Sequence, residues 1–113
     1  MYQPDKFVVL KLTTDKGQVH YRVLGSWVGG YLDGDSWRLN SGITEVSAIG
    51  PLLYFRGSSG STYEVHRDTY GLTSYTASVL GKWESDYTLD VGPKVEVLPH
   101  DTDWVNFDWE GVD

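Results

Sequence analysis

Turn signals occur so often along this chain that only one segment keeps the periodicity of a helix. The 113 residues include 13 glycines and 4 prolines. Both residue types mark turns, glycine because it accepts positive φ and proline because its own φ is fixed. Between the turn signals, apolar and polar residues alternate, which is the pattern of half-buried β-strands. The sequence therefore predicts a mostly-β protein built from short antiparallel strands.

The alternation predicts seven strands, two pairs of which form hairpins. Gly17 lies in the turn between the first two strands, and Gly57–Ser61 links the fifth strand to the sixth. Residues 25–34 are too rich in glycine for a helix and are expected to form short, bent strands with bulges. The seven predicted strands are Lys6–Thr13, Gln18–Leu24, Ser36–Asn40, Ile43–Ile49, Leu52–Arg56, Thr62–His66 and Lys94–Leu98.

One amphipathic helix is predicted over residues 72–83. Its apolar residues fall at spacings of three, four, one and three and are Leu72, Tyr75, Val79, Leu80 and Trp83, with Thr73 or Ser74 available as the N-cap. The predicted fold class is mostly-β α+β, with a compact antiparallel sheet or a partly open barrel and this one helix. We expect residues 1–99 to form a single domain and residues 100–113 to form an acidic, aromatic C-terminal arm.

Length and composition exclude several classes of protein. A chain of 113 residues has room for one core of modest size, which excludes two-domain enzymes and α/β barrels. The absence of cysteine excludes disulfide scaffolds and thiolate zinc sites. No apolar run approaches the roughly 20 residues of a membrane span, and residues 1–6 lack the features of a signal peptide. We therefore expect a cytoplasmic protein with no membrane partner.

Negative charge is concentrated at the C-terminal end. The whole chain carries a net charge of -7, and residues 84–113 alone hold nine acidic residues and one basic residue. Large aromatic side chains alternate with these acids, and they are expected to pack either on the body or on a partner, since exposure to water is costly. The predicted contacts to a basic partner surface are Asp101, Asp103, Trp104, Phe107, Asp108, Trp109 and Glu110.

A second candidate site binds a small phosphate ligand. Successive backbone N–H groups in a glycine-rich turn can form an anion nest, and two arginines flank such a turn here. The predicted residues are Arg56, Gly57, Ser58, Ser59, Gly60 and Arg67. Direct binding to DNA or RNA is not expected, because the negative net charge would repel the phosphate backbone.

The short motifs that suggest catalysis lack their partners. Gly34–Trp37 reads Gly-Asp-Ser-Trp and is similar to an esterase block, but Val97 stands where the matching Asp-x-x-His would place its Asp before His100. The sequence shows no other pair of nucleophile and base. We therefore expect no catalytic residue and a protein that is not an enzyme.

Metal sites are equally incomplete. Asp33 with Asp35, and Asp101 with Asp103, each resemble the start of a calcium loop but lack the remaining ligands. The three histidines have no metal-binding spacing. We expect surface turns at both aspartate pairs, no metal and no cofactor.

Three aromatic residues in the glycine-rich stretch have two alternative roles. Trp27, Tyr31 and Trp37 either fill the core of a small domain or form a platform on which a sugar stacks.

Two segments resemble small open reading frames of tailed phages. They are Trp27–Thr44, which reads WVGGYLDGDSWRLNSGIT, and Ser59–Gly71, which reads SGSTYEVHRDTYG. The resemblance implies a small acidic protein that binds and blocks a host or defence component. We therefore expect a non-enzymatic inhibitor whose carboxylates stand in for phosphates in a basic, nucleic-acid-binding site. The alternatives are a nucleotide-signal-binding sponge and a virion structural component that assembles as a homo-oligomer.

Overall fold

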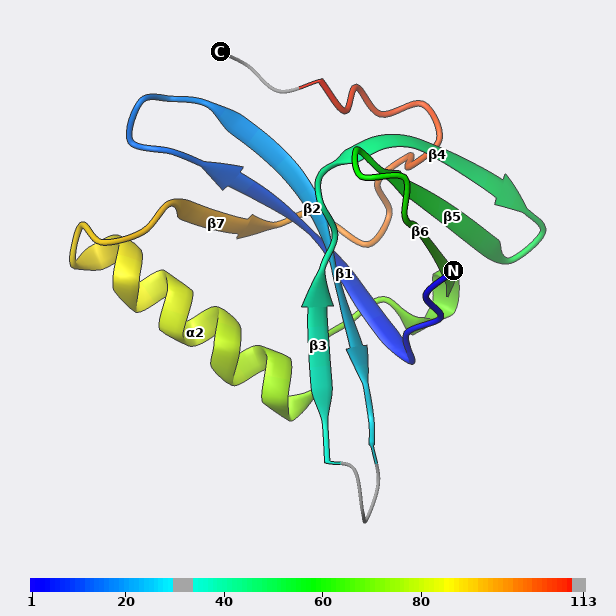
Figure 1. The fold of residues 1–113 in the computed structure, drawn as a ribbon, viewed down its shortest axis with the longest axis horizontal. Helices are drawn as coiled ribbons and strands as arrows, with labels where there is room; N and C mark the ends of the chain where they lie inside the picture. The colour runs from blue at the N-terminus through cyan, green and yellow to red at the C-terminus, as the bar shows by residue number, and fades with distance from the viewer. Residues whose placement is uncertain (30–33, 111–113) are drawn as a thin grey trace.

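The computed structural model describes residues 1–29 and 34–110, which form two antiparallel sheets and one α-helix (Figure 1). The four-stranded sheet has the order β3-β2-β1-β7 and the three-stranded sheet has the order β4-β5-β6. The structure confirms the mostly-β α+β class. The two sheets do not close into a barrel. The strands are β1 Lys6–Thr13, β2 Val19–Trp27, β3 Ser36–Leu39, β4 Ile43–Ile49, β5 Leu52–Gly57, β6 Thr62–His66 and β7 Lys94–Val97.

The predicted strands and both hairpins are confirmed, with one difference in β2. This strand continues through Gly25 to Trp27 instead of breaking into short, bent strands. Glycine suits this position because a Cβ atom on Gly25 would lie only 3.1 Å from the Pro4 side chain and 3.4 Å from Tyr63, which is tight contact. The glycine therefore lets the strand pass under its neighbours. The rest of the predicted bent region, residues 30–33, lies outside the described residues.

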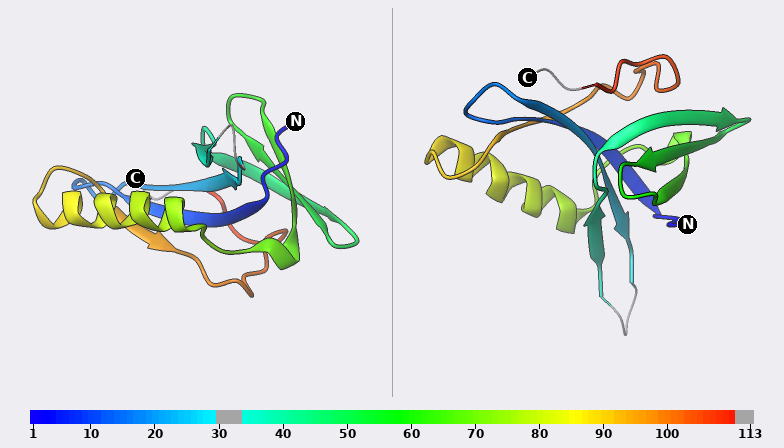
Figure 2. Two further views of the ribbon diagram at one scale, coloured as in Figure 1. Left: turned by 90° about the horizontal axis from the view of Figure 1, so that it is seen from below. Right: turned by 45° about the horizontal axis from the view of Figure 1, so that its top comes forward.

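Strands β1 and β2 are buried on both faces, and each face belongs to a separate apolar cluster. Phe7, Val9 and Val23 point to the three-stranded sheet, whereas Val8, Leu10 and Leu24 point to the helix. Figure 2 shows the helix and the three-stranded sheet on opposite sides of this strand pair. Burial on two faces explains why β1 carries the nearly continuous apolar run Phe7–Leu10.

Helix α2 covers one face of the four-stranded sheet and spans Ser74–Thr88. Thr73 is its N-cap and forms a capping box with Thr76, as the N-cap prediction required. The helix runs five residues beyond the predicted end. Residues 84–88 are mostly exposed and lack apolar periodicity, so the sequence pattern placed the end too early. Tyr75 was wrongly assigned to the buried face and is exposed, whereas Leu80 is buried against β1 and β2.

The Tyr70 hydroxyl joins three segments of the chain. It donates a hydrogen bond of 2.6 Å to the backbone oxygen of Leu98 and accepts one of 3.1 Å from the backbone N–H of Val9. Leu98 follows β7 and also donates its own N–H to the oxygen of Val9 at 2.9 Å. Tyr70 thereby holds the chain leaving β7 against β1.

We predict that Tyr70→Phe lowers the free energy of unfolding by about 1 to 3 kcal/mol, because it leaves a half-buried N–H and a carbonyl oxygen without their shared partner. Urea unfolding measures the loss. Tyr87→Phe is the matched control, since Tyr87 is exposed, and we expect it to change stability by less than about 0.5 kcal/mol. Equal effects of the two substitutions would contradict this role of Tyr70.

We also predict that the difference in the free energy of unfolding between the wild type and Tyr70→Phe becomes smaller at high pH. Burial raises the pKa of Tyr70 from 10.0 to about 12. As the pH rises from 10 to 12, the unfolded chain ionises before the folded one, so the wild type loses stability that the phenylalanine variant does not lose. Burial also raises the pKa of Tyr63, but that residue is present in both proteins and cancels in the difference. Unfolding midpoints measured at pH 8, 10 and 12 test this, and a constant difference would contradict it.

Candidate partner-binding groove

The C-terminal segment, defined here as residues 100–110, packs on the body beside the three-stranded sheet (Figure 1). Two of its tryptophans enter the larger core cluster, where Trp104 is 5% exposed and Trp109 is 9% exposed. The centroid of the Trp104 ring lies 5.9 Å from that of Phe55 and 5.4 Å from that of Tyr70. The centroids of the Trp109 and Tyr21 rings are 5.6 Å apart. The Trp109 indole N–H donates a hydrogen bond of 3.1 Å to the Trp104 backbone oxygen, which satisfies the polar group of the buried ring.

This burial corrects the expectation that Trp104 and Trp109 anchor a partner. Of the two alternatives for these rings, packing on the body or on another protein, the structure shows the first. Both rings pack in the larger core cluster, so neither can serve as a protruding anchor, although the edge of Trp109 still borders a surface groove. Residues 100–110 are therefore built into the core at two points.

The remaining predicted contacts of this segment face outward. Asp101, Asp103, Asp108 and Glu110 are exposed, and Phe107 is half-buried with its ring 5.1 Å from that of Tyr21. Two of the carboxylates brace the local backbone. Asp103 accepts a hydrogen bond of 2.9 Å from the side-chain amide of Asn106, and Asp108 accepts one of 3.1 Å from the backbone N–H of Glu110. The tryptophans thus hold a short acidic stretch in a defined conformation on the surface.

A groove separates this acidic stretch from strand β4 and has a volume of about 620 Å³. One wall comes from the first half of β4 and the other from the C-terminal segment. Its lining includes three carboxylates and no basic residue. The residues that line it are Ile43, Thr44, Glu45, Val46, Val105, Phe107, Asp108, Trp109 and Glu110.

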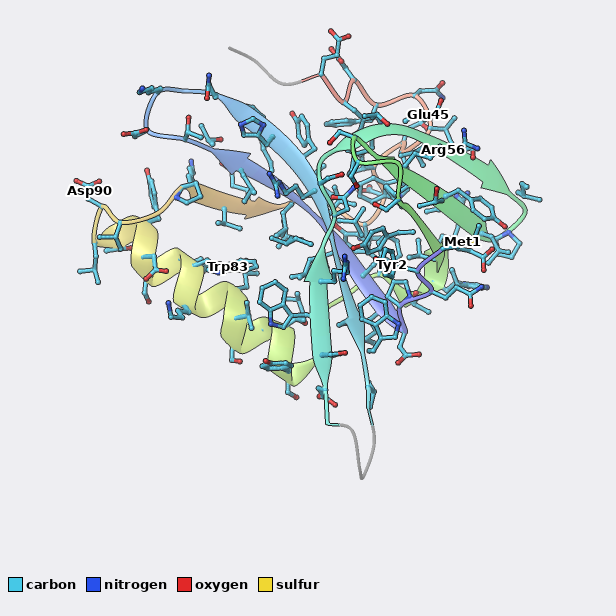
Figure 3. All side chains as sticks on the ribbon, in the orientation of Figure 1. Met1, Tyr2, Glu45, Arg56, Trp83 and Asp90 are labelled. Carbon is cyan, nitrogen blue, oxygen red and sulfur yellow. The ribbon has the colours of Figure 1, made fainter. Side chains whose placement is uncertain are left out.

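Within the groove, apolar surface lies next to negative charge. Val105 is 47% exposed and Phe107 is half-buried, so the groove offers apolar contact area as well as carboxylates. Glu45 accepts a hydrogen bond of 2.7 Å from Arg56, which lies beside it on the neighbouring strand (Figure 3). Asp108 and Glu110 form no salt bridge within the described residues. Their charge therefore remains available to a cation.

Sequence reasoning missed the β4 wall of the groove. The strand Ile43–Ile49 was predicted with its bounds, but strand order depends on contacts between distant segments, which periodicity does not report. Glu45 and Val105 carried no motif. The only available signal was the location of an acidic segment next to an exposed strand, and that requires the fold.

The structure does not assemble the predicted phosphate site. The backbone N–H groups of the Gly57–Gly60 turn already donate to protein acceptors, at 2.8 to 3.0 Å, including Ser61, Gly42 and the Ser41 hydroxyl. Arg56 forms a salt bridge with Glu45. Arg67 follows the last residue of the five-residue strand β6, so it lies about 17 Å along the strand from the turn. The turn is therefore a closed hairpin loop and not an anion nest.

The aromatic platform is not formed by the two tryptophans that the structure describes. Trp27 donates its indole N–H to the backbone oxygen of Gln3 at 3.1 Å and packs against the larger core cluster. Trp37 pairs with Ser26, so it points to the other face of the sheet, where its ring lies 5.3 Å from that of Trp83. Tyr31 and Asp33 lie outside the described residues.

The remaining motifs fall at scattered positions. The His66 side chain accepts a hydrogen bond of 3.2 Å from the backbone N–H of Asp68 and caps a short 3-10 helix. His20 and His100 are exposed. In residues 1–29 and 34–110, no three His, Asp or Glu side chains are arranged so that they could hold a metal ion. Over the same ranges, no helix has both the length and the apolar character to cross a membrane.

We predict that Trp109→Ala lowers the free energy of unfolding by about 3 to 5 kcal/mol, because it removes a buried ring and the hydrogen bond that joins two points of the C-terminal segment. Val105→Ala in the same segment should cost less than about 1 kcal/mol, since Val105 is about half exposed. Chemical unfolding compares the two. A loss below about 1 kcal/mol for Trp109→Ala would show that the segment does not belong to the core.

No family model, no curated protein and no solved structure matches this chain.

Proposed function

We propose that this chain is a non-enzymatic binding protein whose acidic groove receives a basic segment of another protein. The observation that carries the proposal is the groove between β4 and the C-terminal segment, whose lining holds three carboxylates, exposed apolar surface and no basic residue. Carboxylates around a groove attract a cationic partner, orient it and raise its rate of association.

The proposed role of the two buried tryptophans is indirect. They fix the backbone that carries Asp108 and Glu110, so little conformational freedom is lost when a partner binds. The exposed apolar contacts of the groove are then Val105 and the accessible part of Phe107. Charge sets orientation in this arrangement, and these two side chains add burial.

The partner class that fits such a surface best is a nucleic-acid-binding protein. Its binding site is rich in Lys and Arg, which pair with carboxylates as they do with phosphates. We propose that the chain acts as a nucleic-acid mimic that blocks such a site, with a host defence enzyme confronting a phage as the setting. The support is the exposed acidic stretch together with the sequence resemblance to phage reading frames.

The proposal is tested with a capped nonapeptide of alternating Lys and Val, and with its counterpart in which Glu replaces Lys. We predict that the Lys peptide binds and that the Glu peptide does not. Raising the salt from about 50 to 300 mM should weaken binding several-fold, because exposed charges are screened. Titration calorimetry measures both effects.

The matched variants carry the same change in charge at two places. Asp108→Asn with Glu110→Gln should weaken binding of the Lys peptide about three- to tenfold. Glu84→Gln with Asp90→Asn, which are exposed on and after α2, should leave it unchanged. Figure 3 shows Asp90 at the other side of the molecule from Glu45. Equal losses in the two double variants would mean that net charge alone attracts the peptide, and the groove proposal would be wrong.

A further inference from the structure

The three-stranded sheet has two edges, and residues 1–29 and 34–110 supply a pairing segment to only one of them. At the β6 edge, the Tyr2 N–H donates to the Thr62 oxygen at 2.9 Å, and the Glu64 N–H donates to the Tyr2 oxygen at 2.8 Å. Tyr2 thereby pairs with two of the outward backbone groups of β6. At the other edge, no strand of the described part of the chain pairs with the outer side of β4.

Register identifies which backbone groups of β4 face outward. Ile49 pairs with Leu52 across the two-residue turn Gly50-Pro51, and in such a hairpin this pair exchanges hydrogen bonds. The pairs alternate from there, so Ser47 and Glu45 point their N–H and C=O groups to β5. Val46 and Ala48 point theirs away from the sheet.

The opposite edge supports this assignment. On the central strand, alternation gives Leu53 and Phe55 their hydrogen bonds to β6, which leaves Glu64 facing outward. That is the residue whose N–H reaches Tyr2. Among the described residues, no backbone hydrogen bond outside the β4–β5 ladder reaches Val46 or Ala48.

Of these two residues, Val46 lines the acidic groove and is 6% exposed, whereas Ala48 is exposed and lies two residues further along the same edge. An exposed strand edge is a template for another strand, and proteins that keep their edges single usually block them with charges or bulges. Here a register shift between Ile43 and Glu45 interrupts the pairing at the start of β4, but it leaves Val46–Ile49 in regular pairing. Within this regular part, Ser47–Ile49 are exposed, so the edge is open there.

We propose that the basic segment binds in extended form and adds as a fourth strand to β4, pairing its backbone with Val46 and Ala48. This rests on the proposed function and specifies how the partner is held. The strand would lie between β4 and the C-terminal segment, with its Lys or Arg side chains near Glu45, Asp108 and Glu110. A second copy of this chain is a poorer occupant, because pairing two β4 edges would bring the same three carboxylates of both copies together.

Two variants of Ala48 separate backbone pairing from side-chain contact. Ala48→Pro removes an N–H that faces away from β5, and proline is tolerated on such an edge. Ala48→Val keeps the N–H and adds bulk. We predict that Ala48→Pro weakens binding of the alternating Lys-Val nonapeptide about tenfold, whereas Ala48→Val binds within about twofold of the wild type. Circular dichroism and urea unfolding check that both variants fold.

Modified peptides give a test that does not depend on any variant folding. Successive residues of a strand point their N–H groups to opposite edges, so the Val amides and the Lys amides of the nonapeptide face different ways. Strand addition predicts that N-methylation of one set abolishes binding while methylation of the other set weakens it far less. Amide exchange of Val46 and Ala48 should also slow in the presence of the unmodified peptide.

The outcomes are distinguishable from those for the proposed function. If Asp108→Asn with Glu110→Gln loses affinity while Ala48→Pro and both methylated peptides bind as well as their controls, the acidic groove stands and strand addition is wrong. If sedimentation shows that the wild type dimerises and Ala48→Pro does not, the occupant of the edge is a second copy, which also overturns the inference. If the Lys peptide fails to bind the wild type, the proposed function itself is contradicted.

Discussion

The packing of Trp104 and Trp109 beside Phe55 is the interaction on which the arrangement of the surface depends. The two sheets do not close into a barrel, and these rings belong to the core cluster that contains residues of both sheets. The Trp109 indole N–H also ties the segment to itself through the Trp104 oxygen. Burial of two indoles gives an otherwise irregular stretch of chain a defined position.

The groove follows from that position. Because the rings point inward, the alternating carboxylates point outward, and the stretch Val105–Glu110 becomes one wall facing β4. The hydroxyl of Tyr70 adds a second attachment by holding Leu98, where the segment leaves the sheet. A binding surface built on fixed backbone loses less entropy on association than a flexible acidic tail would. The aromatic residues of the segment therefore serve the proposed function through the fold.

Local sequence patterns were sufficient for the secondary structure and insufficient for the site. The alternation in Ile43–Ile49 and the Thr73 cap determine their elements through neighbouring residues, so both were predictable. Which strand lies at an edge depends on long-range pairing, and the covering of β6 by Tyr2 carries no periodic signal. Trp104 and Trp109 were predicted as contacts to a partner because they alternate with acidic residues, and packing on the body was the alternative. A tryptophan next to aspartates is equally consistent with a ring that turns inward while its neighbours turn outward, and only the fold distinguishes the two.

The proposed binding mode is tested most directly by locating a bound basic segment relative to β4. Nuclear Overhauser contacts between the Lys-Val nonapeptide and this chain report that position without any substitution. The account predicts contacts from the peptide backbone to Val46 and Ala48, and from its side chains to Val105 and Phe107. Contacts confined to α2 or to the far sheet edge, with none to β4, would contradict it.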